Sequence, residues 1–170
     1  MESQIIEKAI SGDTEALTIL IDKYKDIAFN LALSIVKNRE DAKDITQDSF
    51  LKIIENINRF RSDSKFSTWL YRIVYNQSIG FIKRENRTNQ VDYSLLVETT
   101  DNNQEDSIQD LYKAINKLED TDRNIIMLFY LAEKSIKEIA QITGLSISNI
   151  KVILHRARKK LFEKMDYENN

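Results

Sequence analysis

The stretch SIKEIAQITGLSISNIKVILHRARKKL, residues 135–161, decides the architecture of the C-terminal half of the chain. Ser135 and Glu138 have the S-x-x-E spacing of a capping box, in which each side chain bonds the other residue's backbone N–H at a helix start. Gly144 suits the left-handed backbone that ends a helix, and Ser146 suits the N-cap of the next one. The order predicts two helices joined by a tight turn, a helix-turn-helix.

The second helix of this pair has two chemically different sides. Its apolar residues recur with helical spacing and predict a buried stripe: Ile150, Ile153, Leu154, Ala157 and Leu161. The solvent side is expected to carry Ser148, Asn149, Lys151, Val152, His155, Arg156, Arg158 and Lys159. Small polar groups near the N-terminus and cations further along are typical of a helix that reads the DNA major groove and anchors on phosphates. The alternative is an amphipathic surface helix with solvated lysines.

Composition narrows the fold and the chemistry. The 170 residues include no proline, no cysteine, three glycines and one histidine. Because helix breakers are nearly absent and strand-like alternation is hard to find, we predict an all-α protein. Without cysteine there is no disulfide or thiolate metal site, and a lone histidine argues against a histidine-based catalytic or metal centre, so no cofactor is expected. The start MESQIIEKAI does not resemble a signal peptide, no apolar run is long enough to span a membrane, and a cytoplasmic location is expected.

The small net charge of −2 hides a strong alternation along the chain. Residues 1–58 carry −4 and residues 88–133 carry −7, whereas residues 59–87 carry +5 and residues 134–165 carry +6. Two basic segments separated by an acidic one suggest two contacts with nucleic acid.

Periodicity and turn residues predict the helices. They are expected at 4–10, 13–36, 39–57, 68–87, 107–118 and 121–131, before the helix-turn-helix. We expect Asp13, Ser67 and Asp120 to act as N-caps and Asn38 to end the second helix. Residues 88–106 lack a helical period and have the composition of a linker. The expected organisation is two small helical domains, 1–90 and 107–165, with a linker at 91–106.

Aromatic and basic side chains concentrate in the segment 60–87. Six of the chain's aromatic residues fall between Phe60 and Phe81. On the expected helix, one face collects Trp69, Arg72, Asn76, Lys83 and Arg87. Rings stack on unpaired bases, cations hold phosphates and an amide can read a base edge, so this face suits single-stranded nucleic acid. The alternative is that the rings are core, which we favour for Tyr71 and Tyr75.

The helix EDAKDITQDSFLKIIENI, residues 40–57, has an unusual outer side. Its expected core stripe is Ala42, Ile45, Phe50, Ile53 and Ile57, and its outer side carries Asp44, Gln47, Asp48, Leu51 and Glu55. A large apolar residue among acids suggests a docking surface for a basic, partly apolar partner helix. Two alternatives are a solvated acidic face and a carboxylate metal site at Asp41, Asp44 and Asp48.

Together, DAKDITQDSFLKI, FRSDSKFSTWLYRIVYN with IKRENR, and the helix-turn-helix ending in HRARKKL resemble the extracytoplasmic-function sigma factors of the sigma-70 family. The resemblance covers residues 4–165. It implies a non-enzymatic transcription initiation factor that binds the RNA polymerase core through the β′ clamp helices and β flap, binds promoter DNA, and is held by an anti-sigma protein. The chain departs from the family's frequent G-T-V-K-S-R at residues 148–153, where Val152 and Ile153 replace polar residues.

The resemblance also implies roles for individual residues. Those implied to contact the polymerase core are Asp44, Gln47, Asp48 and Leu51. Those implied to recognise the minus-10 box and hold its melted strand are Phe60, Arg61, Ser62, Asp63, Ser64, Lys65, Trp69, Arg72, Asn76, Lys83, Arg84 and Arg87. Those implied to read the minus-35 box are Ser148, Asn149, Lys151, Val152, His155, Arg156 and Lys159. Two other classes remain open: a helix-turn-helix repressor or activator, and a metal-dependent recombinase or nuclease that uses the acids of residues 41–48.

Overall fold

Helices make up all the regular structure in the part of the chain that the computed structural model describes, residues 2–88, 114–115 and 117–168. The N-terminal elements are α1 (Glu2–Ile10), α2 (Thr14–Val36), α3 (Arg39–Asn56), the 3-10 turn η1 (Ile57–Arg59) and α4 (Phe66–Thr88). The C-terminal elements are α6 (Asp120–Ile126), the π-helical turn η2 (Met127–Leu131), α7 (Ile136–Thr143) and α8 (Ile147–Glu168). The expected all-α fold is confirmed. The expected linker and most of the expected helix at 107–118 lie outside the described residues.

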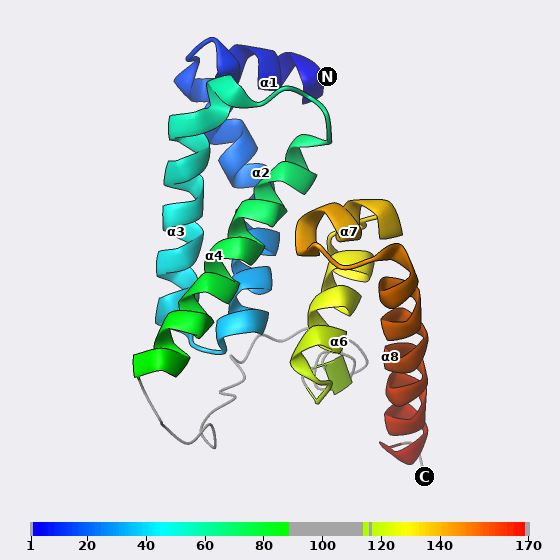
Figure 1. Cartoon of the computed structure of the whole chain (residues 1–170). Helices are drawn as coiled ribbons and strands as arrows, with labels where there is room; N and C mark the ends of the chain where they lie inside the picture. The colour runs from blue at the N-terminus through cyan, green and yellow to red at the C-terminus, as the bar shows by residue number, and fades with distance from the viewer. Residues whose placement is uncertain (1, 89–113, 116, 169–170) are drawn as a thin grey trace.

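Helix α2 is the centre of the N-terminal domain. It packs against both α3 and α4, while α1 lies across one end of the bundle (Figure 1). Its buried residues Leu20, Ala28 and Leu31 recur with helical spacing, so one stripe of α2 faces the core. Asp13 caps the helix as predicted, because its Oδ1 accepts from the backbone N–H of Glu15 at 2.9 Å.

The connection between α2 and α3 corrects one prediction. Asn38 does not end α2; Lys37 does, with a left-handed backbone at φ 60°. Asn38 instead caps α3, since its Oδ1 accepts from the N–H of Glu40 at 2.9 Å and of Asp41 at 3.1 Å. Asparagine is favourable both at the C-terminal end of a helix and at an N-cap, so the residue type alone did not decide between these two positions.

The start of α4 corrects a second prediction. The helix begins at Phe66, so Ser67 lies inside the first turn and is not the N-cap. The Ser67 side chain is only 6% exposed. The first turn is closed by the carbonyl of Lys65, which accepts from the N–H of Thr68 at 3.0 Å and of Trp69 at 3.2 Å. The Ser67 hydroxyl is therefore available for a tertiary contact.

The C-terminal domain contains the predicted helix-turn-helix. The capping box is present at Ser135 and Glu138, and Gly144 ends α7 with φ 76°. The Oγ of Ser146 accepts from the N–H of Asn149 at 3.2 Å, so the second cap is also present. All five residues expected in the apolar stripe of α8 are buried. On α7, Ile139 and Ile142 are buried.

The helix before the helix-turn-helix is shorter than expected. Asp120 is the first residue of α6 and Glu119 occupies the N-cap position without a side-chain hydrogen bond, so Asp120 is not the cap. The expected helix to Leu131 changes into the π turn η2 after Ile126. Apolar periodicity does not distinguish a wider turn from an α-helix over five residues.

The two domains touch along two lines. Helix α7 packs against α4, and α6 packs against α2 (Figure 1). The two basic helices, α4 and α8, belong to different domains. Helix α7 packs against both of them and so lies between them.

Candidate polymerase and nucleic-acid interfaces

Helix α3 presents the predicted acidic face to solvent. Asp44, Gln47 and Asp48 are exposed, and Leu51 is 51% exposed among them. The opposite stripe is buried from Ala42 to Ile57, as expected. Sequence reasoning missed Ile54, which is 40% exposed one turn from Leu51. A second exposed apolar residue widens the apolar part of this face, which strengthens its fit to a partly apolar helix.

The acids of α3 are close enough to affect one another. Burial, together with the negative charges of Glu85, Asp44 and Glu40, raises the pKa of Asp41 above its ordinary value. Desolvation and nearby like charges both disfavour the ionised form of a carboxyl group. Among the described residues, however, no group of three or more metal-ligating side chains is arranged to hold an ion.

Aromatic rings form a wall at the N-terminal end of α4. The ring centroids of Phe60 and Trp69 are 5.2 Å apart, and those of Phe66 and Trp69 are 6.0 Å apart. Phe66 is buried, whereas Phe60 and Trp69 are half-buried and keep part of their rings accessible. Tyr71 is 1% exposed, so it is a core residue as favoured from sequence. Tyr75 is half-buried, so its exposure is intermediate between that of a core residue and that of an accessible ring.

The remaining candidate residues around this wall are mostly accessible. Arg72, Asn76, Lys83 and Arg84 are exposed along α4. The loop before the helix is also exposed apart from the half-buried Ser64: Arg61, Ser62, Asp63 and Lys65. Ser62 has a left-handed backbone with φ 58°. The side chain of Arg87 lies outside the described residues.

The outer face of α8 matches the prediction closely. Ser148, Asn149, Lys151, Val152, His155, Arg156 and Lys159 are all exposed. Val152 is 61% exposed, an apolar group at the centre of the face. Ile153, the other departure from the family's polar pattern, is buried in the core. The face therefore offers amide, hydroxyl, imidazole and ammonium groups around one apolar contact.

Arg156 has a partner within the protein. Its Nη2 and Nε donate to the carboxylate of Asp122 on α6, the Nε bond measuring 3.2 Å. Lys160 donates to the same carboxylate at 3.2 Å and to Glu119 at 3.1 Å. Asp122 is fully buried. Part of the hydrogen-bonding capacity of Arg156 is thus used to fix α8 against α6.

Arg158 is also held by the fold. Its Nε donates to the Tyr130 hydroxyl at 2.8 Å, and its guanidinium lies 5.2 Å from the Phe129 ring centroid and 5.6 Å from that of Tyr130. Sequence reasoning did not find this contact. The neighbouring residues Phe129 and Tyr130 of the π turn could have indicated this contact, because guanidinium groups favour aromatic faces.

Two family models match the chain in the order of its two domains. Sigma-70 region 2 matches residues 20–88 and sigma-70 region 4 matches residues 108–161. The chain is 31% identical to the ECF RNA polymerase sigma factor SigW of Bacillus subtilis, over 92% of each chain. It is also 31% identical to the RNA polymerase sigma factor SigV of Bacillus subtilis, over 86% of this chain and 89% of SigV.

Both matched regions are regions of sigma-70 RNA polymerase sigma factors, so the chain belongs to this class of protein. Within that class the chain belongs to the ECF sigma factors. It is therefore a sigma factor that directs promoter-specific transcription, an initiation factor and not an enzyme.

Solved structures share the fold. The sigma factor RpoE of Bartonella quintana, solved with the anti-sigma factor NepR, superposes with a TM-score of 0.73 at 24% identity, covering 88% of this chain and 96% of that chain. CnrH, solved with the cytosolic domain of CnrY, superposes with a TM-score of 0.69 at 24% identity, covering 96% of each chain. Within the described residues, none of the helices has the length and apolar content needed to cross a bilayer.

Proposed function

We propose that this sigma factor grips its promoter at two points, with α8 reading the minus-35 box and the N-terminal end of α4 holding the melted minus-10 strand. The observation that supports this most strongly is the position of the two exposed basic faces. One lies on α4 and the other on α8, and these helices belong to the two segments that match regions 2 and 4. Two basic faces on separate domains suit one duplex contact and one single-strand contact.

Helix α8 has the chemistry for groove reading. Ser148, Asn149 and Lys151 occupy its first turns, where a recognition helix meets base edges. Val152 would contact a thymine methyl group, which is the apolar group of the major groove. Lys159, further along, would contact phosphate. Arg156 would act mainly through Asp122, by orienting the helix, and its exposed part would remain near the DNA backbone.

The N-terminal end of α4 has the chemistry for an unpaired base. Phe60 and Trp69 offer accessible ring surface on which a base can stack, at about 1–3 kcal/mol per base. Further along the helix, Asn76 supplies an amide that can pair with a base edge, while Arg72 and Lys83 supply charge for phosphates. Stacking favours the open strand over the duplex, so binding energy would be converted into strand opening.

The acidic face of α3 would bind the polymerase core. Leu51 and Ile54 provide the apolar centre, with Asp44, Gln47 and Asp48 around them. An amphipathic helix of basic character fits such a surface. By family resemblance this partner is the β′ clamp helices, and region 4 would bind the β flap. An anti-sigma protein is a further proposed partner, because RpoE, which shares the fold, was solved in complex with one.

Run-off transcription with added core polymerase tests the proposed function. Asn76→Ala should retain core binding and lower promoter opening, read as weaker permanganate reactivity of minus-10 thymines. Gln4→Ala, at an exposed amide of α1, is the matched control and should behave as wild type. Permanganate reactivity of Asn76→Ala equal to wild type would remove the assigned role. A stable dimer that binds duplex without polymerase would instead favour a repressor or activator.

A further inference from the structure

The side chain of Gln77 forms a bridge between α4 and α3. Its Nε2 donates to the Ser49 hydroxyl at 2.9 Å, and its Oε1 accepts from the Lys52 ammonium at 3.0 Å. Ser49 and Lys52 both belong to α3, the helix that carries the proposed docking face, whereas Gln77 belongs to α4. One amide therefore makes two hydrogen bonds to the opposite helix, one with each of its ends.

The buried end of this bridge fixes which way the amide points. Ser49 is fully buried, and its hydroxyl donates its own hydrogen to the Ile45 carbonyl at 2.7 Å. A hydroxyl that has used its one hydrogen can only accept a further bond. The NH2 group of Gln77 must therefore face Ser49, which directs the amide oxygen toward Lys52. Because its other end is anchored, this oxygen is a fixed acceptor for a cation.

Lys52 has alternative partners on its own helix. Asp48 lies four positions earlier, and an acid four residues before a lysine is the favourable order for an ion pair on a helix. Glu55 lies three positions later, a spacing that also permits such a pair. All three side chains are exposed. The Lys52 ammonium lies instead at the Gln77 oxygen of α4, so it does not neutralise Asp48.

We propose that Gln77 is a positioning residue for the docking face of α3: it holds the Lys52 ammonium on the α4 side, so that Asp48 stays available to a basic partner helix. The inference rests on the proposed function, because it matters only if this face binds the polymerase core. Gln77 acts through Lys52 and needs no contact with the partner. Without its oxygen, Lys52 would pair with Asp48 or Glu55, and a pair with Asp48 would have to break before the partner could bind there.

The expected effect on docking is modest and depends on salt. Breaking an exposed ion pair before docking should lower the affinity for the polymerase core by about two- to fivefold, in keeping with the strength of such pairs. Salt screens exposed pairs, so the loss of affinity should shrink as the ionic strength rises. A defect in the packing of α3 against α4 would lack this salt dependence, which distinguishes the positioning of a charge from a merely structural role.

Three variants test the role of Gln77. Gln77→Leu keeps the approximate size of the side chain and removes both hydrogen bonds. Gln77→Leu combined with Lys52→Met also removes the cation that Gln77 holds, so the pair with Asp48 cannot form and the affinity should return to the wild-type value. Gln77→Glu keeps an oxygen for Lys52 and should bind core at least as tightly as wild type. Gln4→Leu, at an exposed amide of α1, is the matched control.

Binding is measured with the full chain and purified core RNA polymerase. Because the chain has no cysteine, Glu7→Cys at an exposed position of α1 provides a single site for fluorescein. Fluorescence anisotropy then follows the titration with core across a series of salt concentrations, and urea unfolding checks that each variant is folded. We expect Gln77→Leu to bind about two- to fivefold more weakly than wild type at low salt, and the double variant and Gln4→Leu to bind as wild type.

Leu51→Lys in the same titration separates this inference from the proposed function. If Leu51→Lys binds core as wild type does, the docking face is overturned and the inference with it. If Leu51→Lys loses binding while Gln77→Leu binds as wild type, the inference alone is overturned. Equal weakening of Gln77→Leu and of the double variant would show that Gln77 acts through Ser49 and helix packing, which would overturn the role assigned to Lys52. A loss of affinity that salt does not change would overturn that role as well.

Discussion

The buried carboxylate of Asp122 on α6 accepts hydrogen bonds from both Nε and Nη2 of Arg156, which lies on the exposed side of α8. The proposed recognition helix is therefore oriented by a charged bond to the preceding helix as well as by its apolar stripe. Lys160 adds a second cation to the same carboxylate. The orientation of α8 depends on a group that would never touch DNA.

Asp122→Asn should lower the free energy of unfolding. The substitution keeps the shape but removes the charge that two cationic donors share, and a hydrogen bond to a charged group contributes about 1.5–3 kcal/mol. Because Arg156 is partly exposed, we expect a loss of about 2 kcal/mol, measured by urea unfolding. Asp26→Asn, at an exposed position of α2, is the control and should change the free energy little.

The difference in the free energy of unfolding between wild type and Asp122→Asn should depend on pH. Burial alone would raise the pKa of Asp122, but the bonds from Arg156 and Lys160 outweigh it and hold the pKa below its ordinary value. A depressed pKa in the folded state stabilises the protein above the ordinary value, and this stabilisation is lost as pH falls through the folded-state pKa. The difference between wild type and Asp122→Asn should be full at pH 7 and shrink below about pH 4. A constant difference down to about pH 3 would contradict this assignment.

Two glycines should respond oppositely to alanine. Gly144 has φ 76° and no atom within 4 Å of an added methyl group, so Gly144→Ala meets only backbone strain and should destabilise by about 1 kcal/mol. Gly80 lies within α4, and its added methyl would meet only the Arg84 guanidinium at 3.8 Å. Gly80→Ala should stabilise by up to about 1 kcal/mol. Thermal unfolding of both variants checks the signs.

Leu51→Lys should abolish co-purification with core polymerase. A lysine at the apolar centre of the α3 face leaves a charge where a partner helix would bury it. Ile19→Lys makes the same kind of change at another exposed apolar residue, on α2, and should preserve co-purification. Equal recovery of the two variants would place the docking surface elsewhere.

Lys159→Ala should lower the salt dependence of duplex binding. Each phosphate contact releases counterions, so loss of one contact reduces the logarithmic salt slope by about 1. Lys43→Ala, at an exposed lysine of α3, should leave the slope as in wild type. Slopes are compared on one minus-35 duplex across a series of salt concentrations.

The sequence predicted most of the local structure because its signals are local. The cap of α2 by Asp13, the capping box at Ser135 and the left-handed Gly144 were all identified from residue type and spacing. The errors at Asn38 and Ser67 have one cause. Asparagine and serine suit several positions at a helix end, so only the observed backbone decides which one they occupy.

The contacts between elements could not be predicted in the same way. Thr68 and Glu138 are separated by 70 positions, and Asp122 and Arg156 by 34. No periodicity within one helix indicates which polar residue of another helix it meets. The exposed faces of α3 and α8 were predicted because they require only the apolar stripe opposite them.

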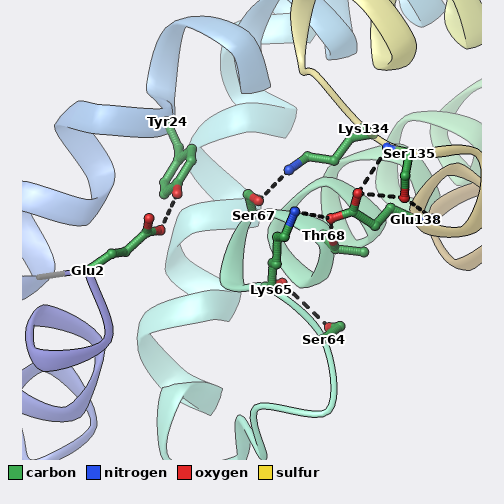
Figure 2. Close-up of polar contacts among 9 residues, drawn as sticks. All are labelled: Glu2, Tyr24, Ser64, Lys65, Ser67, Thr68, Lys134, Ser135 and Glu138. Atoms are coloured by element: carbon green, nitrogen blue, oxygen red, sulfur yellow. Dashed lines mark hydrogen bonds and ion pairs between the residues drawn. The ribbon is translucent and has the colours of Figure 1, made fainter.

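The hydrogen bond from the Thr68 hydroxyl of α4 to the Glu138 carboxylate of α7 joins the two domains (Figure 2), and it has a consequence for promoter search. Because both partners belong to one chain, each meets the other at an effective concentration that a tether sets, in the millimolar range for short connections. Individually weak bonds are therefore enough to keep the domains together. If α8 and α4 bind DNA as proposed, a promoter that has engaged α8 would gain the same advantage, since its minus-10 strand would then be tethered near α4. A promoter with correctly spaced boxes would thus present its minus-10 strand to α4 at a high local concentration. A DNA molecule with only one box would lack this advantage and compete poorly with the Thr68–Glu138 contact.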